Sequence, residues 1–143
     1  QFSNLFDPSL PLVFGDRDQL VQVFLNLVKN ASEKVPKGNG HILLKTSYQH
    51  GVRFGSKATK DRVQLPLCIS IIDNGPGIDE AIKLQLFEPF VTSKHNGSGL
   101  GLAIVAKIVD DHGGTVEFER LEGQTIFKVM LPVYNLKEGS YDE

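Results

Sequence analysis

The sequence has 143 residues, of which 41% are hydrophobic and 22% are charged, a composition typical of one globular domain with a substantial core. Fifteen Lys and Arg against seventeen Asp and Glu give a net charge of −2, which argues against a surface for nucleic acid or acidic lipid. The single cysteine excludes an internal disulfide, and without a signal peptide or a bilayer-length apolar run we expect a cytoplasmic protein with no membrane contact.

The first third of the chain predicts extended segments followed by a helix. Short apolar runs around Pro8 and Pro11 favour one or two edge strands. A helix is expected after Asp16, whose side chain suits the N-cap position, and it should end near Pro36. Its apolar stripe has helical spacing and consists of Leu20, Val23, Phe24, Leu27, Val28 and Ala31.

A second, polar stripe borders the apolar one on this helix. It consists of Gln19, Gln22, Asn26, Asn30 and Glu33. The ordinary interpretation is a solvated helix face, which is the norm for such stripes. Asn, however, is a poor residue for the middle of a helix, and together with the glycine motifs further along the chain these positions favour a functional face.

The remainder predicts four strands and two helices. The strands are residues 41–48, 67–73, 115–120 and 125–132, and the helices are residues 79–86 and 99–112. The last two strands should form a hairpin across residues 121–124. Residues 49–62 are polar and basic and predict an exposed loop or long hairpin, whereas residues 135–143 are expected to fray. Cys68 lies within an apolar strand and is expected to be a packed core thiol.

Residues 73–102 carry the chemistry of the sequence. They begin with Asp-Asn-Gly-Pro-Gly-Ile and end with Gly-Ser-Gly-Leu-Gly-Leu. Asp73 stands where a buried strand ends, and a carboxylate there needs a partner to offset its desolvation. The glycine-rich run leads into a helix N-terminus, whose unpaired N–H groups and positive dipole end suit phosphate. The pattern indicates a nucleotide site, although its glycine spacing fits neither a dinucleotide fingerprint nor a P-loop.

Four stretches, in order, resemble the catalytic, ATP-binding domain of bacterial sensor histidine kinases, of the superfamily shared with DNA gyrase, Hsp90 and MutL. They are Asn26 with Asn30, residues 73–77, Phe-Glu-Pro-Phe at residues 87–90, and residues 97–102, and they are similar to that family's N, G1, F and G2 boxes. The resemblance covers about residues 11–133. The basic segment and the short lid ending at residues 92–97 look most like those of the nitrogen-regulator kinases.

This resemblance implies a fold and an organisation for the chain. The fold is a two-layer α/β sandwich, in which three helices cover one face of a mixed, mostly antiparallel sheet. Residues 1–143 would form a single catalytic domain with a core at residues 11–133 and a polar tail at residues 134–143.

The resemblance also implies ATP and Mg²⁺ as ligands and gives roles to individual residues. Asp73 would accept a hydrogen bond from the adenine amino group, and Thr125 would support the same edge, directly or through water. Asn30 would give its amide oxygen to Mg²⁺, and Asn26 would line the phosphate channel. The other implied nucleotide contacts are Lys34, Gly75, Gly77, Ile78, Thr92, Ser93, Lys94, Gly97, Ser98, Gly99, Leu100, Gly101 and Leu102. Of these, the two glycines of the first motif would admit the base, and the backbone N–H groups of residues 98–101 would bind the phosphates.

One position departs from the family pattern. Many members carry a lysine three residues after the second Asn, where this sequence has Glu33. Lys34 or the lid residue Lys94 could supply the missing cation. We favour Lys94, because a lid residue can reach the γ-phosphate on closure; the alternative is an exposed lysine on a loop. Phe87 and Phe90 suit core aromatics and lid anchors equally well.

The same position-by-position comparison separates a kinase from an ATPase. ATP-hydrolysing members carry Glu one helical turn before the metal-binding Asn, where this chain has Asn26, an amide that cannot act as a general base. A histidine kinase uses the substrate imidazole as nucleophile, so its ATP domain needs only positioning and charge neutralisation. The residues implied to act in catalysis are therefore Asn26, Asn30 and Lys94.

No histidine of this chain resembles the family's phosphoacceptor. His41, His50, His95 and His112 all lie outside a long amphipathic helix of the required kind. We therefore expect an excised catalytic domain that cannot phosphorylate itself. Its expected partners are a histidine-bearing dimerisation domain of the same full-length protein, a response regulator and, if it is of the nitrogen-regulator type, a PII-type protein. Two alternatives stay open: a nucleotide-sensing module without phosphotransfer, and an anti-sigma-factor-type serine kinase.

Overall fold

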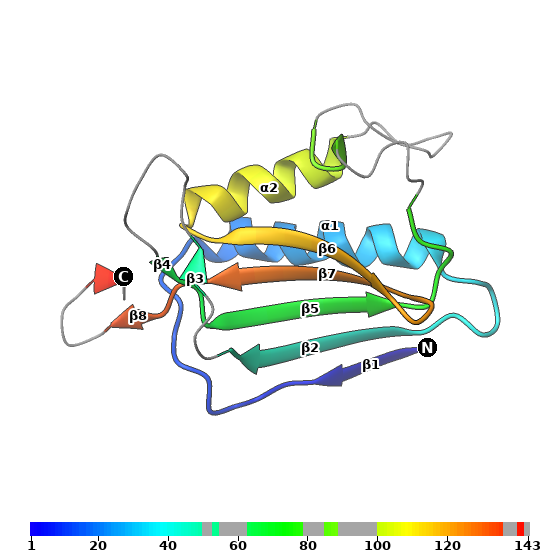
Figure 1. The fold of residues 1–143 in the computed structure, drawn as a ribbon, viewed down its shortest axis with the longest axis horizontal. Coiled ribbons are helices and arrows are strands. Elements are labelled where there is room, and N and C mark those ends of the chain that lie inside the picture. Colours follow the sequence, from blue (N-terminus) through cyan, green and yellow to red (C-terminus); the bar gives the residue numbers. More distant parts are fainter. Residues whose placement is uncertain (50–52, 55–62, 79–84, 89–99, 136–139, 142–143) are drawn as a thin grey trace.

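The computed structural model describes residues 1–49, 53–54, 63–78, 85–88, 100–135 and 140–141. Its centre is a five-stranded sheet with the strand order β1-β2-β5-β7-β6 (Figure 1). The strands are β1 Phe2–Leu5, β2 Ile42–Tyr48, β5 Leu67–Asp73, β6 Thr115–Leu121 and β7 Gln124–Leu131. β1 pairs with β2 in parallel, and every other pair in this sheet is antiparallel, which confirms the predicted mixed sheet.

Two helices, α1 (Arg17–Lys34) and α2 (Gly101–Asp111), lie on one side of the sheet (Figure 1). The core fills the space between them and the strands. It is built mainly from Val23, Leu27 and Ala31 of α1, Val105, Ile108 and Val109 of α2, and Leu67, Ile71, Phe127, Val129 and Leu131 of the sheet. Residues 79–84 of the third predicted helix lie outside the described part of the chain.

The cysteine packs where the sequence predicted. Cys68 is buried in β5 and forms a small apolar cluster with Leu65 and Met130. Because side chains alternate along a strand, Cys68 faces away from its neighbours Leu67 and Ile69, which belong to the core under the helices. The thiol is thus a core side chain.

The caps of α1 agree with the sequence signals. The Asp16 carboxylate accepts a hydrogen bond from the Gln19 N–H at 2.9 Å, so Asp16 is the N-cap. At the other end the Val35 N–H donates to the Ala31 carbonyl at 3.1 Å, and Pro36 follows. Capping therefore fixes both ends of the helix that carries Asn26 and Asn30.

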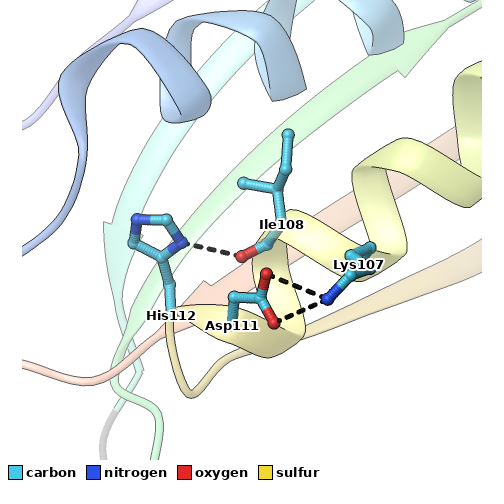
Figure 2. A network of polar contacts seen from close by, with 4 residues as sticks. All are labelled: Lys107, Ile108, Asp111 and His112. Carbon is cyan, nitrogen blue, oxygen red and sulfur yellow. Dashed lines mark hydrogen bonds and ion pairs between the residues drawn. The ribbon is translucent and has the colours of Figure 1, made fainter.

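His112 joins the end of α2 to the start of α1. Its Nδ1 donates to the Ile108 carbonyl at 2.7 Å (Figure 2), and its Nε2 accepts from the Asp16 backbone N–H at 3.0 Å. These partners fix a neutral ring with its proton on Nδ1, because a carbonyl only accepts and an amide N–H only donates. Gly15 is required beside this ring, since a Cβ there would lie 2.6 Å from the His112 Cδ2.

Replacing His112 by Ala should lower the free energy of unfolding by about 2–3 kcal/mol, because two hydrogen bonds of a buried ring are lost and their partners remain. Lys107→Ala, on the same helix, is the matched control. Lys107 pairs with Asp111 at 3.2 Å (Figure 2), but the lysine side chain is 76% exposed, so this change should stay within about 0.5 kcal/mol. Urea unfolding measures both. Equal losses would contradict the structural role of His112.

The hairpin of β6 and β7 is tighter than the sequence suggested. Glu122 and Gly123 have φ values of 50° and 79°, so they form a two-residue turn with both residues in the left-handed region. Leu121 and Gln124, which we expected in the loop, pair with each other. The expected loop of residues 121–124 and the observed two-residue turn both place Arg120 opposite Thr125.

Three further findings concern the periphery. In the basic segment, β3 (Arg53–Phe54) pairs with β4 (Val63–Gln64), which directly follows that segment, as in a hairpin. In the tail that we expected to fray, β8 (Tyr134–Asn135) pairs with β9 (Ser140–Tyr141), a local pairing for which the short polar sequence carries no alternating pattern. Among the described residues, no helix has the length and apolar character needed to cross a membrane.

Candidate nucleotide-binding site

The predicted site residues of four elements meet at one end of the sheet. Figure 1 shows the C-terminal ends of α1, β5 and β6, the start of β7 and the start of α2 at the same end of the molecule, on the right of the view. In the sheet register Asp73 lies opposite Thr125, and Thr125 lies opposite Arg120. Asp73 and Thr125, which the sequence analysis chose for the same base edge, are therefore neighbours.

Asp73 is a buried carboxylate with one unused oxygen. The residue is 1% exposed, and its Oδ1 accepts from the Gly75 N–H at 2.9 Å. Its Oδ2 is buried and has no hydrogen-bond partner among the described residues. Burial raises the pKa of the Asp73 carboxyl above its ordinary value, although the Gly75 N–H and the charges of Lys34 and Arg120 oppose this. An unpaired buried acceptor is costly, so this atom marks the place for a ligand's hydrogen-bond donor.

Close packing requires the two glycines that follow Asp73. A Cβ on Gly75 would lie 2.9 Å from the Lys34 carbonyl oxygen and 3.0 Å from the Asp73 Oδ1. Gly77 has a φ of +90°, and a Cβ there would lie 3.0 Å from the Arg120 Nη1. The turn is thus pressed against the end of α1 on one side and Arg120 on the other. That these glycines also admit a base stays a prediction.

Gly75→Ala should lower the free energy of unfolding by about 1–3 kcal/mol, because the new methyl group meets a backbone oxygen of α1 that cannot move aside. Gly101→Ala is the matched control: Gly101 begins α2, and apart from its chain neighbours and its own helix backbone no atom of the described residues lies within 4 Å of its added Cβ. That change should leave stability equal or raise it by up to about 1 kcal/mol. Thermal unfolding compares the two, and equal destabilisation would refute the packing argument.

Sequence reasoning missed Arg120 and the role of Asn74. Arg120 Nη1 donates to the Gly75 carbonyl at 2.8 Å and to Thr125 Oγ1 at 2.7 Å. Asn74 points the other way: its Nδ2 donates to the Asn39 carbonyl at 2.9 Å, and its Oδ1 accepts from the His41 N–H at 2.8 Å. Asn74 therefore ties the turn to the start of β2. The predicted hairpin already placed Arg120 opposite Thr125, and that was the available signal.

The two asparagines of α1 lie one helical turn apart and are in different environments. Asn30 is 7% exposed, and its Nδ2 is buried without a partner among the described residues. Asn26 Nδ2 donates to the Gly101 carbonyl at 3.4 Å, which links α1 to the first turn of α2. A buried Asn30 rules out the solvated-face interpretation for that residue, and its amide nitrogen is a donor without an acceptor in the described part of the chain.

The remaining predicted site residues are divided between described and undescribed segments. Ile78 and Leu102 are partly buried and pack on the core, and Leu100 occupies the N-cap position of α2, where its apolar side chain cannot accept from the first-turn N–H groups. Phe87 is a core aromatic that packs edge-to-face on Phe127, with the two ring centroids 6.2 Å apart. Thr92, Ser93, Lys94, Gly97, Ser98 and Gly99, together with Phe90, lie outside the described residues.

Lys34, one of the two lysines considered for the γ-phosphate, lies in the described part of the chain at the end of α1. Its charge lowers the pKa of Asp73, so it acts at the end of the site where the carboxylate lies. Its backbone carbonyl also contacts the turn at Gly75. These observations associate Lys34 with the Asp73 end of the site.

Residues 15–135 match the family of histidine kinase-, DNA gyrase B- and HSP90-like ATPases, and the chain belongs to this family of ATP-binding domains. Among its relatives, the sensory histidine kinase/phosphatase NtrB of Azospirillum brasilense is 52% identical over 142 residues, which cover 99% of this chain and 36% of that protein. The chain thus spans about a third of the length of such relatives. The resemblance to the histidine kinase family and, within it, to NtrB proteins is confirmed.

Solved structures of histidine kinases have the same fold as this chain. The chain superposes on the mycobacterial sensor histidine kinase MprB with a TM-score of 0.73 at 29% identity, covering 92% of this chain and 82% of that one. For the catalytic domain of the histidine kinase ThkA in a nucleotide-free form, the TM-score is 0.71 at 32% identity, with 92% and 77% covered. The predicted kinase-type sandwich is therefore the fold of this chain.

Proposed function

We propose that this chain is the single Mg·ATP-binding catalytic domain of a two-component sensor histidine kinase of the nitrogen-regulator type. It would donate the γ-phosphate of ATP to a histidine on a separate dimerisation domain. The observation that carries the proposal is the buried Oδ2 of Asp73, which has no hydrogen-bond partner in the described part of the chain and lies on the strand next to Thr125. An adenine amino group is a donor of the kind that this atom lacks.

Selectivity for adenine tests this proposal. Guanine presents a carbonyl oxygen where adenine presents its amino group, so a guanine base would set two acceptors against each other in a buried site. The unchanged chain should therefore bind Mg·ATP at least about a hundredfold more tightly than Mg·GTP. Calorimetric titration measures both affinities, and equal affinities would refute the adenine assignment.

The metal would be held mainly through Asn30. Mg²⁺ prefers oxygen ligands and keeps phosphate and water in its shell, so one amide oxygen on α1 suffices as the protein's contribution. When bound, the ion neutralises charge on the phosphates. Asn30 is buried beside the core, and its amide nitrogen has no partner among the described residues. This nitrogen is a donor, which suits a phosphate oxygen, and the amide oxygen is the atom that we assign to Mg²⁺.

The phosphates would lie toward the start of α2. Leu100 cannot cap this helix with its side chain, which leaves first-turn N–H groups suited to an anion. We propose that the backbone of residues 98–101 binds the phosphates and that Lys94 meets the γ-phosphate. The position of Lys34 near Asp73 supports the choice of Lys94.

Transfer to a histidine outside this chain is supported by the described histidines. Both ring nitrogens of His112 are engaged, and the Nε2 of His41, which directly precedes β2, lies 3.1 Å from the Oγ of Ser3 in β1. Asn26 occupies the position of the catalytic Glu in ATP-hydrolysing members, and an amide cannot activate water. A phosphotransferase domain therefore fits better than a hydrolase.

The proposed partners follow from the similarity to NtrB proteins. They are the histidine-bearing dimerisation domain of the same full-length protein, a response regulator that receives the phosphoryl group, and a PII-type signalling protein, all in the cytoplasm. A nucleotide-sensing module without phosphotransfer is the competing assignment, and the two differ in whether phosphohistidine forms.

A further inference from the structure

Arg120 reaches from the end of β6 to both sides of the proposed base site. Its Nη1 donates to the Gly75 carbonyl at 2.8 Å and to the Thr125 Oγ1 at 2.7 Å. Arg120 itself is exposed to solvent, whereas Thr125 is 0% exposed. Because a guanidinium can only donate, the buried threonine oxygen is an acceptor in this pair.

No described residue accepts a hydrogen bond from the Thr125 hydroxyl. A threonine hydroxyl has one hydrogen and two lone pairs, and Arg120 uses one of the lone pairs. Among the described residues no acceptor takes the hydrogen: Asp73 Oδ1 accepts from Gly75, and Asp73 Oδ2 has no partner. The adjacent ends of β5 and β7 thus offer a ligand one acceptor, on Asp73, and one donor, on Thr125.

Arg120 also determines which partner the hydroxyl prefers. A positive charge 2.7 Å from the Oγ1 strengthens its O–H as a donor and disfavours a second group that donates to the same oxygen. The base that fits has an amino donor next to a ring-nitrogen acceptor. Adenine has this order at its amino group and N1, and guanine, with O6 next to N1–H, has the reverse.

We infer that Arg120 is a specificity-determining positioning residue, which directs the Thr125 hydroxyl to donate to N1 of adenine. The inference rests on the proposed function and deepens it. In this arrangement Asp73 reads the amino group, and Arg120, acting through Thr125, reads N1. Arg120 does not touch the base.

The first test uses the unchanged chain with ATP and with 1-deazaadenosine triphosphate, in which C–H replaces N1. Loss of the acceptor leaves the buried hydroxyl hydrogen unpaired, so calorimetry should show binding weakened by at least about tenfold. No variant is needed for this comparison. An equal affinity for the two nucleotides would overturn the inference.

The second test assigns the effect to Arg120. In Arg120→Met the preference for ATP over the deaza analogue should fall from about tenfold to about threefold or less, and Arg120→Lys, which keeps a charge and a donor, should restore most of it. In Thr125→Val the preference should vanish, and adding Arg120→Met should change it no further. Arg17→Met is the control and should leave the preference unchanged, because Arg17 is at the start of α1 and the site is at the end of that helix.

The outcomes separate this inference from the proposed function. If the unchanged chain fails to bind ATP, both are overturned. If it binds ATP and Arg120→Met keeps the full preference, or if Arg120→Met still alters it in the Thr125→Val background, only the role of Arg120 is overturned. A variant that lowers ATP and deaza-ATP affinity equally would likewise show a merely structural arginine.

Discussion

Replacing Asp73 by Asn is expected to weaken Mg·ATP binding by at least about a hundredfold and to leave the ligand-free domain as stable or more stable. The asparagine oxygen can still accept from the Gly75 N–H, as Asp73 Oδ1 does at 2.9 Å. The other terminal atom then becomes an NH₂ group, which donates toward the adenine amino group. Two donors that face each other exclude adenine, whereas guanine, with its carbonyl, is no longer repelled.

The stability half of this prediction follows from the pKa of Asp73. Burial raises that pKa, so the folded state holds the proton more tightly than the unfolded state does. The contribution of this group to stability therefore falls as pH rises from the ordinary carboxyl range through the raised pKa, and it is constant above that.

The affinity for ATP should change in the opposite direction and rise with pH, because only the ionised carboxylate leaves both oxygens as acceptors. Urea unfolding and ATP titration across this pH window should show both trends, and Asp73→Asn should remove them. An unchanged preference for ATP over GTP in this variant would contradict the assignment.

Asn30→Ala should remove the metal contact without damaging the fold. The variant deletes an amide whose nitrogen is buried without a described partner, and alanine is the better helix former, so thermal stability should change little or rise. The affinity for ATP in the presence of Mg²⁺ should fall by at least about tenfold, to a value close to that measured with a chelator.

Ser32→Ala is the matched control for this change. Ser32 lies on the same helix, and its exposed hydroxyl donates to the Lys29 carbonyl at 2.8 Å. Its replacement should leave both the metal dependence and the affinity unchanged. If Asn30→Ala unfolded the ligand-free domain while metal dependence persisted, Asn30 would be a structural residue.

Local signals explain which parts of the fold could be predicted from the sequence. Asp16 before an amphipathic stripe and Pro36 after it fixed the limits of α1, and the apolar run before Asp73 predicted β5. The parallel pairing of β1 with β2 and the pair β8–β9 carry no comparable signal, because strand partners depend on the assembled sheet. α2 begins at Gly101, two residues later than expected, since glycine-rich runs blur helix starts.

In the site, the sequence identified the residues that chemistry singles out but not those that support them. Asp73 at a strand end and Asn30 in mid-helix are unusual residues in their places. Arg120 and His112 look ordinary in sequence, and their contacts join positions 45 residues apart for Arg120 and Gly75 and 96 apart for His112 and Asp16. Such contacts become visible only once the chain has folded.

Phosphotransfer in trans is the measurement that tests the central claim most directly. This chain would be mixed with radiolabelled Mg·ATP and a histidine-bearing dimerisation domain of an NtrB-type kinase. We expect acid-labile phosphohistidine on the added domain, none on this chain alone, and none with Asp73→Asn or Asn30→Ala. If the chain binds ATP but no phosphohistidine forms, or if the label is acid-stable as phosphoserine is, the chain is not a histidine kinase domain.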